Sequence, residues 1–177
     1  MEKKSKRSSK KRSSAKPKKL SLKKVDWYGL RHDLVREKFE GDLTFVNYMN
    51  VGDKGDVIAA VYHAAKPNLD KGHKEFMLLW KYYDRAQDKE QWVVSGMTRE
   101  QIEKHAEVEG LACLKCNQAL WSLNRHHFHS CGCKNDMFVD GGKEYLRAGA
   151  KALAKTMPVR INLLTDEIVL DSKPQAR

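Results

Sequence analysis

The 177-residue sequence contains no run of apolar residues long enough to cross a bilayer, and its mean hydropathy is −0.69. No apolar segment follows the basic N-terminus, so the sequence does not have the pattern of a secretory signal peptide. The glycine-rich motifs that bind nucleotides and the serine elbow of hydrolases are also missing. These absences predict a soluble protein of the cytoplasm with no membrane partner.

Cysteine is missing from residues 1–112 and 134–177, and all four cysteines lie within 21 positions. Their spacing is Cys-x2-Cys, a loop of 14 residues, and Cys-x-Cys: Cys113, Cys116, Cys131 and Cys133. A secreted disulfide framework normally spreads its cysteines along the chain. Thiols clustered in a reducing cell are more typical of a metal site.

Two close cysteine pairs joined by a short hairpin are the pattern of a zinc ribbon. Gly132 favours this arrangement because it can adopt a positive φ that lets both sulfurs of the second pair face one point. Four thiolates fill the tetrahedron of one Zn²⁺ and leave no position for water, so the ion is expected to be structural. Two alternatives remain open. In the first, one of His126, His127 and His129 replaces a cysteine as a metal ligand. In the second, no metal binds, and the cysteines are either reduced thiols or a redox pair.

Acidic residues are almost absent from residues 1–24, which contain twelve Lys or Arg and one acid, Glu2. The rest of the chain has 22 basic and 22 acidic residues, so the formal charge of +11 belongs to this basic arm. The arm has too little apolar surface to offset the entropy lost on ordering, and we predict that it is disordered until it binds polyphosphate. A solubilising tail or an address label is the alternative interpretation.

The predicted nucleic-acid contacts are the cations of the arm and two residues of the cysteine loop. They are Lys3, Lys4, Lys6, Arg7, Lys10, Lys11, Arg12, Lys16, Lys18, Lys19, Arg125 and His127.

The segment between the arm and the cysteines is predicted to be a small mixed domain over residues 25–110. Helical spacing of apolar residues favours a helix over 27–40, and β-branched residues favour a hairpin from 43–51 and 57–63. Residues 75–83 are ambiguous between strand and helix, whereas 91–96 favour a strand. Thr98 and Gln101 fit a capping box, which starts a helix that runs to about Glu109, with Gly110 at the C′ position.

The C-terminal domain is predicted to span residues 111–171. It contains the zinc ribbon, a strand over 137–139, an Ala- and Leu-rich helix over 143–154 and a β-hairpin over 159–164 and 167–170. The predicted fold class is therefore α+β: a disordered basic N-terminal arm, a small mixed domain, and a C-terminal zinc ribbon followed by a helix and a β-hairpin.

Residues 113–147 resemble a small Cys-rich domain that recurs in uncharacterised bacteriophage proteins. The matching motifs are Cys113-x-x-Cys116, Arg125-His126-His127-Phe128-x-x-Cys131-x-Cys133 and Val139-Asp140-Gly141-Gly142-x-x-Tyr145-Leu146-Arg147. His127 stands where the resemblance implies Asp, and Lys134 stands where it implies Gly. The resemblance implies a bacteriophage source, and hence the cytoplasm of a host cell, but no reaction.

Three functions compete. The first is a non-catalytic zinc protein that associates with DNA or RNA through the basic arm and the ribbon. The second is a protein-interaction module that docks on a host or phage enzyme such as the transcription machinery, which the neutral body favours. The third and most remote is a zinc-dependent deaminase, in which His73 and Glu75 join Cys113 and Cys116. The sequence does not specify an oligomeric state.

Overall fold

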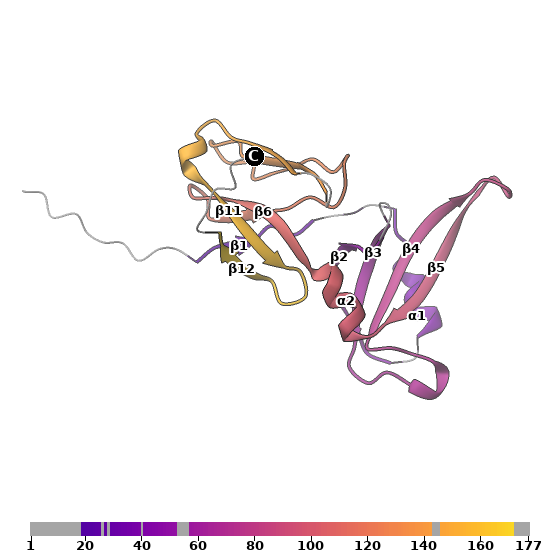
Figure 1. Ribbon diagram of the computed structural model, residues 1–177. Coiled ribbons are helices and arrows are strands. Elements are labelled where there is room, and N and C mark those ends of the chain that lie inside the picture. Colours follow the sequence, from indigo (N-terminus) through magenta and orange to yellow (C-terminus); the bar gives the residue numbers. More distant parts are fainter. Residues whose placement is uncertain are drawn as a thin grey trace, which may run out of the picture.

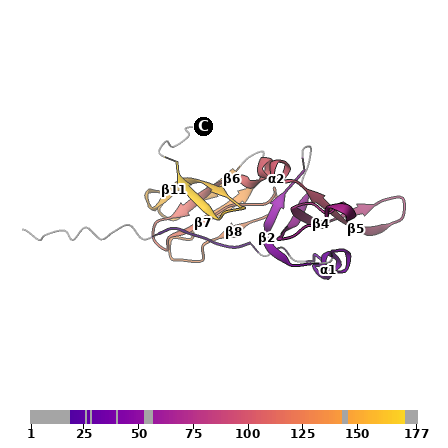
Figure 2. The same cartoon turned by 90° about the horizontal axis from the view of Figure 1, so that it is seen from below.

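The computed structural model describes residues 19–25, 27, 29–39, 41–52, 57–142 and 146–171. Strands dominate this part of the chain and form three sheets, accompanied by two short α-helices (Figure 1). Within the described residues, no helix has the length and apolar character needed to span a bilayer. A four-stranded sheet occupies one end of an elongated molecule, and the other two sheets occupy the opposite end (Figures 1 and 2).

The four-stranded sheet is antiparallel, with its strands in chain order. It consists of β2 (Leu43–Asn50), β3 (Ile58–Ala64), β4 (Phe76–Asp84) and β5 (Lys89–Met97). The predicted hairpin of β2 and β3 and the predicted strand at β5 are confirmed, and the ambiguous segment is strand β4. Six of the seven residues of β3 are buried, as expected for a central strand with both faces covered.

Two short helices pack against this sheet: α1 (Asp33–Lys38) and α2 (Arg99–Ala106). The predicted capping box is present, because Thr98 Oγ1 accepts a hydrogen bond from Gln101 N at 3.3 Å and Gln101 Oε1 accepts one from Thr98 N at 2.9 Å. The helix predicted over 27–40 is only six residues long. Gly29 adopts φ +88°, outside the right-handed helical region, so a helix cannot continue through it.

A five-stranded sheet follows, in the order β1-β7-β6-β11-β12. Its strands are β1 (Ser21–Leu22), β7 (Gln118–Leu120), β6 (Glu107–Cys113), β11 (Thr156–Asn162) and β12 (Glu167–Leu170). The predicted C-terminal hairpin of β11 and β12 is confirmed. The prediction that Gly110 ends the preceding helix is wrong. Gly110 lies inside β6, where a Cβ would stand 2.4 Å from Leu120 O and 2.7 Å from Ile161 Cδ1, so glycine is required by close packing.

The third sheet contains β8 (His129–Ser130), β9 (Phe138–Gly141) and β10 (Leu146–Gly149), in the order β10-β9-β8. Short 3₁₀ turns lie at Leu69–Lys71 and Leu153–Lys155. The predicted helix over 143–154 is wrong, although residues 143–145 lie outside the described residues. β10 pairs with β9 from Leu146 opposite Gly141 to Gly149 opposite Phe138. This pairing outweighs the helix propensity of its Ala and Leu residues.

The predicted α+β fold class, with a helix after the ribbon, is therefore incorrect, and the described chain is mostly β. The end of the predicted arm is also ordered. Ser21 and Leu22 pair in parallel with Gln118 and Ala119 of β7. Residues 1–18 of the arm lie outside the described residues, so the disorder predicted for them stays a prediction.

The apolar side chains form two clusters. The larger one joins the four-stranded and five-stranded sheets, since it contains Val61 of β3 and Ile161 of β11 together with Trp121 from the loop after β7. The smaller one contains Leu120, Met137 and Val139 with the buried cysteines. Because so few apolar residues surround the cysteines, the small cluster needs a further source of stability.

Candidate metal centre

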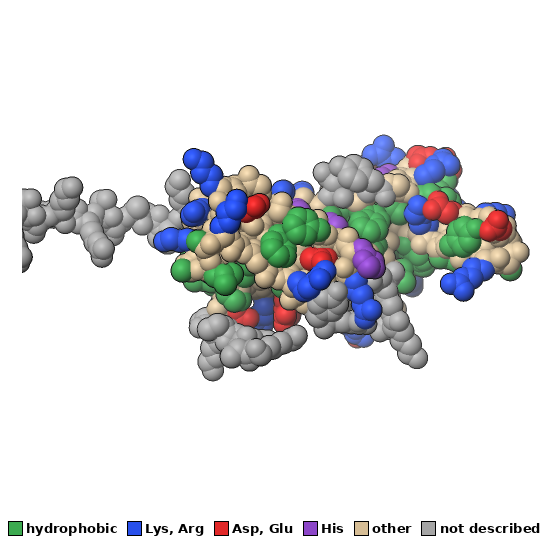
Figure 3. All heavy atoms as spheres, turned by 90° about the horizontal axis from the view of Figure 1, so that it is seen from above, with side chains coloured by type: hydrophobic (Ala, Val, Ile, Leu, Met, Phe, Trp, Pro, Cys, Tyr) green, Lys and Arg blue, Asp and Glu red, His purple; other side chains and the backbone are tan. Residues whose placement is uncertain are grey.

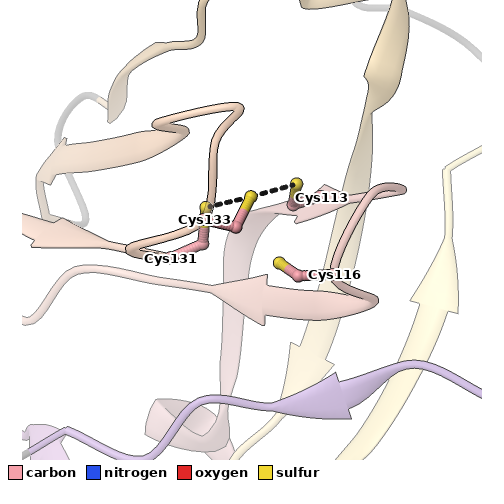
Figure 4. Close-up of side chains that lie close together, drawn as sticks. All are labelled: Cys113, Cys116, Cys131 and Cys133. Atoms are coloured by element: carbon pink, nitrogen blue, oxygen red, sulfur yellow. Dashed lines mark hydrogen bonds between the residues drawn. The ribbon is translucent and has the colours of Figure 1, made fainter.

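The four predicted cysteine ligands converge at one point (Figure 4). Cys113 ends β6, Cys116 lies in the turn to β7, and Cys131 and Cys133 lie between β8 and β9. Each Sγ is within 4.8 Å of every other, and the distances from Cys133 Sγ are 3.6 Å to Cys113 Sγ and 3.4 Å to Cys131 Sγ. A tetrahedron with Zn–S bonds of about 2.3 Å has S···S edges of about 3.8 Å. The cluster therefore matches the size of a tetrathiolate site, and the cysteines are not disulfide-bonded.

Two tight turns bring the cysteine pairs together. In the first, Asn117 N donates to Cys113 O at 2.7 Å, and Asn117 adopts φ +58°. In the second, Asp136 N donates to Cys133 O at 2.8 Å. Gly132 adopts φ +66°, and no atom would lie within 4 Å of a Cβ added there, so its role is conformational. The positive φ expected for the glycine between Cys131 and Cys133 is therefore confirmed.

Asn135 is a supporting residue that the sequence analysis did not identify. Its side chain is fully buried, its backbone N donates to Cys133 Sγ at 3.3 Å, and its Nδ2 donates to Cys113 Sγ at 3.7 Å. Its Oδ1 accepts from Ala152 N at 3.1 Å, which ties the second cysteine turn to the segment after β10. Hydrogen bonds to sulfur favour the thiolate and orient the ligands. A buried asparagine is detectable only once the fold is known.

The environment of the thiols favours unequal protonation when no cation is present. Burial acts to raise the pKa of Cys113, but hydrogen bonds from the backbone of Cys116 and Lys115 and with the thiols of Cys116 and Cys133 together outweigh burial and lower that pKa to about 7. Burial raises the pKa of Cys116 to about 12 and also raises that of Cys131. Four negative sulfurs this close require a cation, and a divalent metal would displace the remaining protons as it bound. The donor set therefore fits a soft or borderline metal ion such as Zn²⁺.

The histidines of the cysteine loop do not belong to this cluster, whose members are the four cysteines. His126 is exposed, and His129 Nδ1 lies 3.3 Å from Trp121 O. His127 Nδ1 accepts a hydrogen bond from Leu123 N at 3.2 Å. The His127 and Trp27 rings form an edge-to-face contact with their centroids 6.0 Å apart. The geometry thus favours cysteine over histidine as the fourth ligand.

His127 is uncharged at neutral pH, because burial and the neighbouring His129 lower its pKa to about 4. The role predicted for it in nucleic-acid binding stays a prediction, and it cannot depend on a positive charge in this state. Arg125 is exposed on the same loop, and Lys19 is exposed before β1. The other nine predicted contacts, Lys3 to Lys18, lie outside the described residues.

We expect His127 to make stability depend on pH. Its folded pKa of about 4 lies below the usual 6.5, so between these values the unfolded chain binds a proton that the folded chain does not. The free energy of unfolding is therefore unaffected by His127 well above pH 6.5 and decreases as the pH falls from 6.5 toward 4. The free energy of unfolding of metal-saturated protein should drop from pH 7 to 5.5 by about 1 kcal/mol more in the wild type than in His127→Gln, after allowance for partial exposure. Equal drops in urea titrations would contradict this assignment.

The deaminase arrangement receives no support from the geometry. The ring of His73 packs against that of Phe39 with centroids 4.6 Å apart and planes inclined by 33°, and Glu75 pairs with Arg99 and lies near His63. These residues surround the start of β4 in the four-stranded sheet, and neither joins the cysteine cluster.

One family comparison bears on this site. A domain of unknown function (DUF7695) matches residues 110–150, which include all four cysteines and strands β7 to β10. Searches of curated proteins and of solved structures found no match to the chain. The match supports a recurring domain where the sequence analysis placed one, but it carries neither the bacteriophage source nor the zinc-ribbon classification. The site is thus a four-cysteine centre that can hold a metal ion, within a domain of unknown function.

Proposed function

We propose that this protein is a non-catalytic zinc protein that associates with nucleic acid. In this proposal one structural Zn²⁺ is bound by Cys113, Cys116, Cys131 and Cys133, and the basic arm supplies most of the affinity for phosphate. A bacteriophage origin and a location in the host cytoplasm, where thiols stay reduced, remain part of the proposal.

The zinc assignment is supported by the donor set. Four sulfurs within 4.8 Å of one another can supply all four ligands of a tetrahedral ion, which would then have no open position for water or substrate. The small apolar cluster around the cysteines also favours a structural role, since metal binding adds roughly 10–16 kcal/mol of apparent free energy in small zinc peptides.

The observation that carries the nucleic-acid assignment is the attachment of the basic arm beside the metal centre. Ser21 N donates to Asn117 O at 2.9 Å, directly after the first cysteine turn. Lys23 Nζ donates to Ser130 O at 2.6 Å, directly before Cys131. The arm and the centre therefore meet at one end of the molecule, where cations on the arm and a rigid metal-bound surface can contact the same strand.

The test is the salt dependence of binding of the full-length, zinc-loaded protein to a fluorescent oligonucleotide. Nine cations precede Lys19. The affinity of a protein that makes six to ten phosphate contacts falls by about 10³- to 10⁵-fold when salt is raised from 50 to 200 mM. Anisotropy titrations should show a steep linear decrease of log K with log salt. No binding at 50 mM salt, or binding that barely changes with salt, would overturn the proposal.

A second candidate, docking on a protein partner, is favoured by the projecting β4–β5 hairpin (Figure 1). Tyr82 and Tyr83 near its tip are 51% and 54% exposed, and such aromatic side chains are enriched at protein interfaces. Affinity capture from host lysate with and without nuclease separates the two functions. Partners that persist after nuclease treatment favour docking, and partners that disappear favour nucleic acid.

A further inference from the structure

We propose that Phe128, stacked on Phe138 beside the metal centre, binds an unpaired base of single-stranded nucleic acid. This inference rests on the proposed function and specifies the form of nucleic acid that the protein prefers.

The two rings form a stacked pair at the surface. Their centroids are 5.2 Å apart and their planes are inclined by 24°. Phe128 is 61% exposed, whereas Phe138 is only partly exposed. A Cβ at Gly149 would stand 2.6 Å from Phe138 Cε1, so the Phe138 ring lies directly on the β10 backbone. Phe138 is therefore held between Gly149 and Phe128, and it supports Phe128 in an orientation that leaves much of that ring open.

An open groove of about 450 Å³ borders the pair. Its lining consists of Phe128, Phe138, Asp136, Gly149, Ala150 and Lys151. Lys151 Nζ lies 3.4 Å from an oxygen of Asp136, and both side chains are more than half exposed. An exposed ion pair of this kind contributes little stability, so Lys151 can turn toward a phosphate at small cost. Figure 3 shows one face of the molecule. At the end that carries the five-stranded and three-stranded sheets, Lys and Arg side chains lie around exposed hydrophobic side chains.

The metal centre would keep this platform rigid. Phe128 directly precedes β8, which leads into Cys131, and Phe138 opens β9 just after the second cysteine turn. Cys131 N donates to Met137 O at 2.9 Å, so the same hairpin positions both rings and two sulfurs. A rigid aromatic ring loses little conformational entropy when a base stacks on it.

A base fits this feature better than a protein side chain for two reasons. A single pair of rings is far smaller than the area that a stable protein interface buries. The basic arm that ends beside the centre supplies the positive charge that a nucleic-acid backbone needs. Stacking on an aromatic ring requires an open base face, which single strands offer and an intact duplex does not.

The test compares Phe128→Ala with the wild type on a single-stranded oligonucleotide and on the duplex of the same sequence, by anisotropy at fixed low salt. Loss of one stacked base should weaken single-strand binding about 5- to 100-fold and leave duplex binding unchanged. Phe128→Trp should retain single-strand affinity, and its added indole fluorescence should be quenched by the single strand. Leu153→Ala, which truncates another exposed apolar side chain, is the matched control. Zinc content and circular dichroism verify that each variant is folded.

Different results overturn different statements. If the wild type binds nucleic acid but Phe128→Ala weakens neither form, or weakens both forms equally, the stacking assignment fails and the proposed function stands. If the wild type binds neither form, the proposed function fails and the stacking assignment fails with it.

Discussion

Cys113→Ser is expected to remove the metal from the protein and unfold the region around it. The wild type should contain one zinc ion per chain, and the variant should contain none. Cys113 is fully buried, contacts Cys133 Sγ and accepts a hydrogen bond from Asn135 Nδ2. A serine hydroxyl is a poor zinc ligand at neutral pH, so the variant keeps only three thiolates and loses part of an apparent binding free energy that totals roughly 10–16 kcal/mol in small zinc peptides.

The measurement combines elemental analysis with hydrogen exchange. We expect amide protection in β8, β9 and β10 to fall strongly. The amides of β3 and β4, whose side chains lie in the larger apolar cluster, should keep their protection. Leu114→Ser, at a half-exposed position next to the ligand, is the matched control and should retain zinc. Cobalt substitution of the wild type provides an independent readout, because tetrathiolate Co²⁺ absorbs strongly in the near ultraviolet. The metal assignment is contradicted if wild-type protein purified under reducing conditions contains no zinc and cannot take up Co²⁺.

Removal of residues 1–18 is expected to reduce nucleic-acid affinity by about 10³-fold at 50 mM salt and to flatten its salt dependence. This segment contains nine Lys or Arg residues and one acid. The deletion stops before Ser21, because β1 pairs with β7 and its loss would disturb the sheet beside the first cysteine turn.

A full-length variant with the nine cations replaced by glutamine separates charge from chain length. Both variants should bind zinc with wild-type stoichiometry, since the ligands lie elsewhere. Affinity that survives deletion and glutamine substitution alike would contradict a role for the arm in phosphate binding. Deletion that weakens binding while the glutamine variant does not would show that something other than charge is responsible.

Local patterns were most reliable where neighbouring residues alone satisfy the physical requirement. The capping box of Thr98 and Gln101 was identified correctly because both of its hydrogen bonds form within one turn. The β2–β3 hairpin and the β11–β12 hairpin were also identified, since β-branched residues and the turn residues between them specify the hairpins locally. The cysteine spacing likewise predicted the convergence of four sulfurs.

Errors arose where pairing with another strand determined the conformation. Residues 146–149 have good helix formers, yet they form β10 because β9 offers a complete row of hydrogen-bonding partners. Residues 107–109 were predicted to finish α2, but β11 pairs with the whole of β6 from Glu107 to Cys113. Gly110 was interpreted as a helix terminator, although the contacts that require it come from Leu120 and Ile161. The strand β11, which contains Ile161, lies far from β6 and Gly110 in the sequence, so local patterns do not reveal these partners.

The sequence by itself determined the donor set of the metal site and the position of the positive charge, because both depend only on residue identity and spacing. The tertiary structure decided what surrounds them. It placed Asn135 on two sulfurs, anchored the end of the arm against β7, and stacked Phe128 on Phe138 at the surface. The contacts of Asn135 with Cys113, of the arm with β7 and of Phe128 with Phe138 join residues that are separated in the sequence. Strand pairing brings these residues together, and its free energy depends on the whole sheet and not on the propensity of either segment.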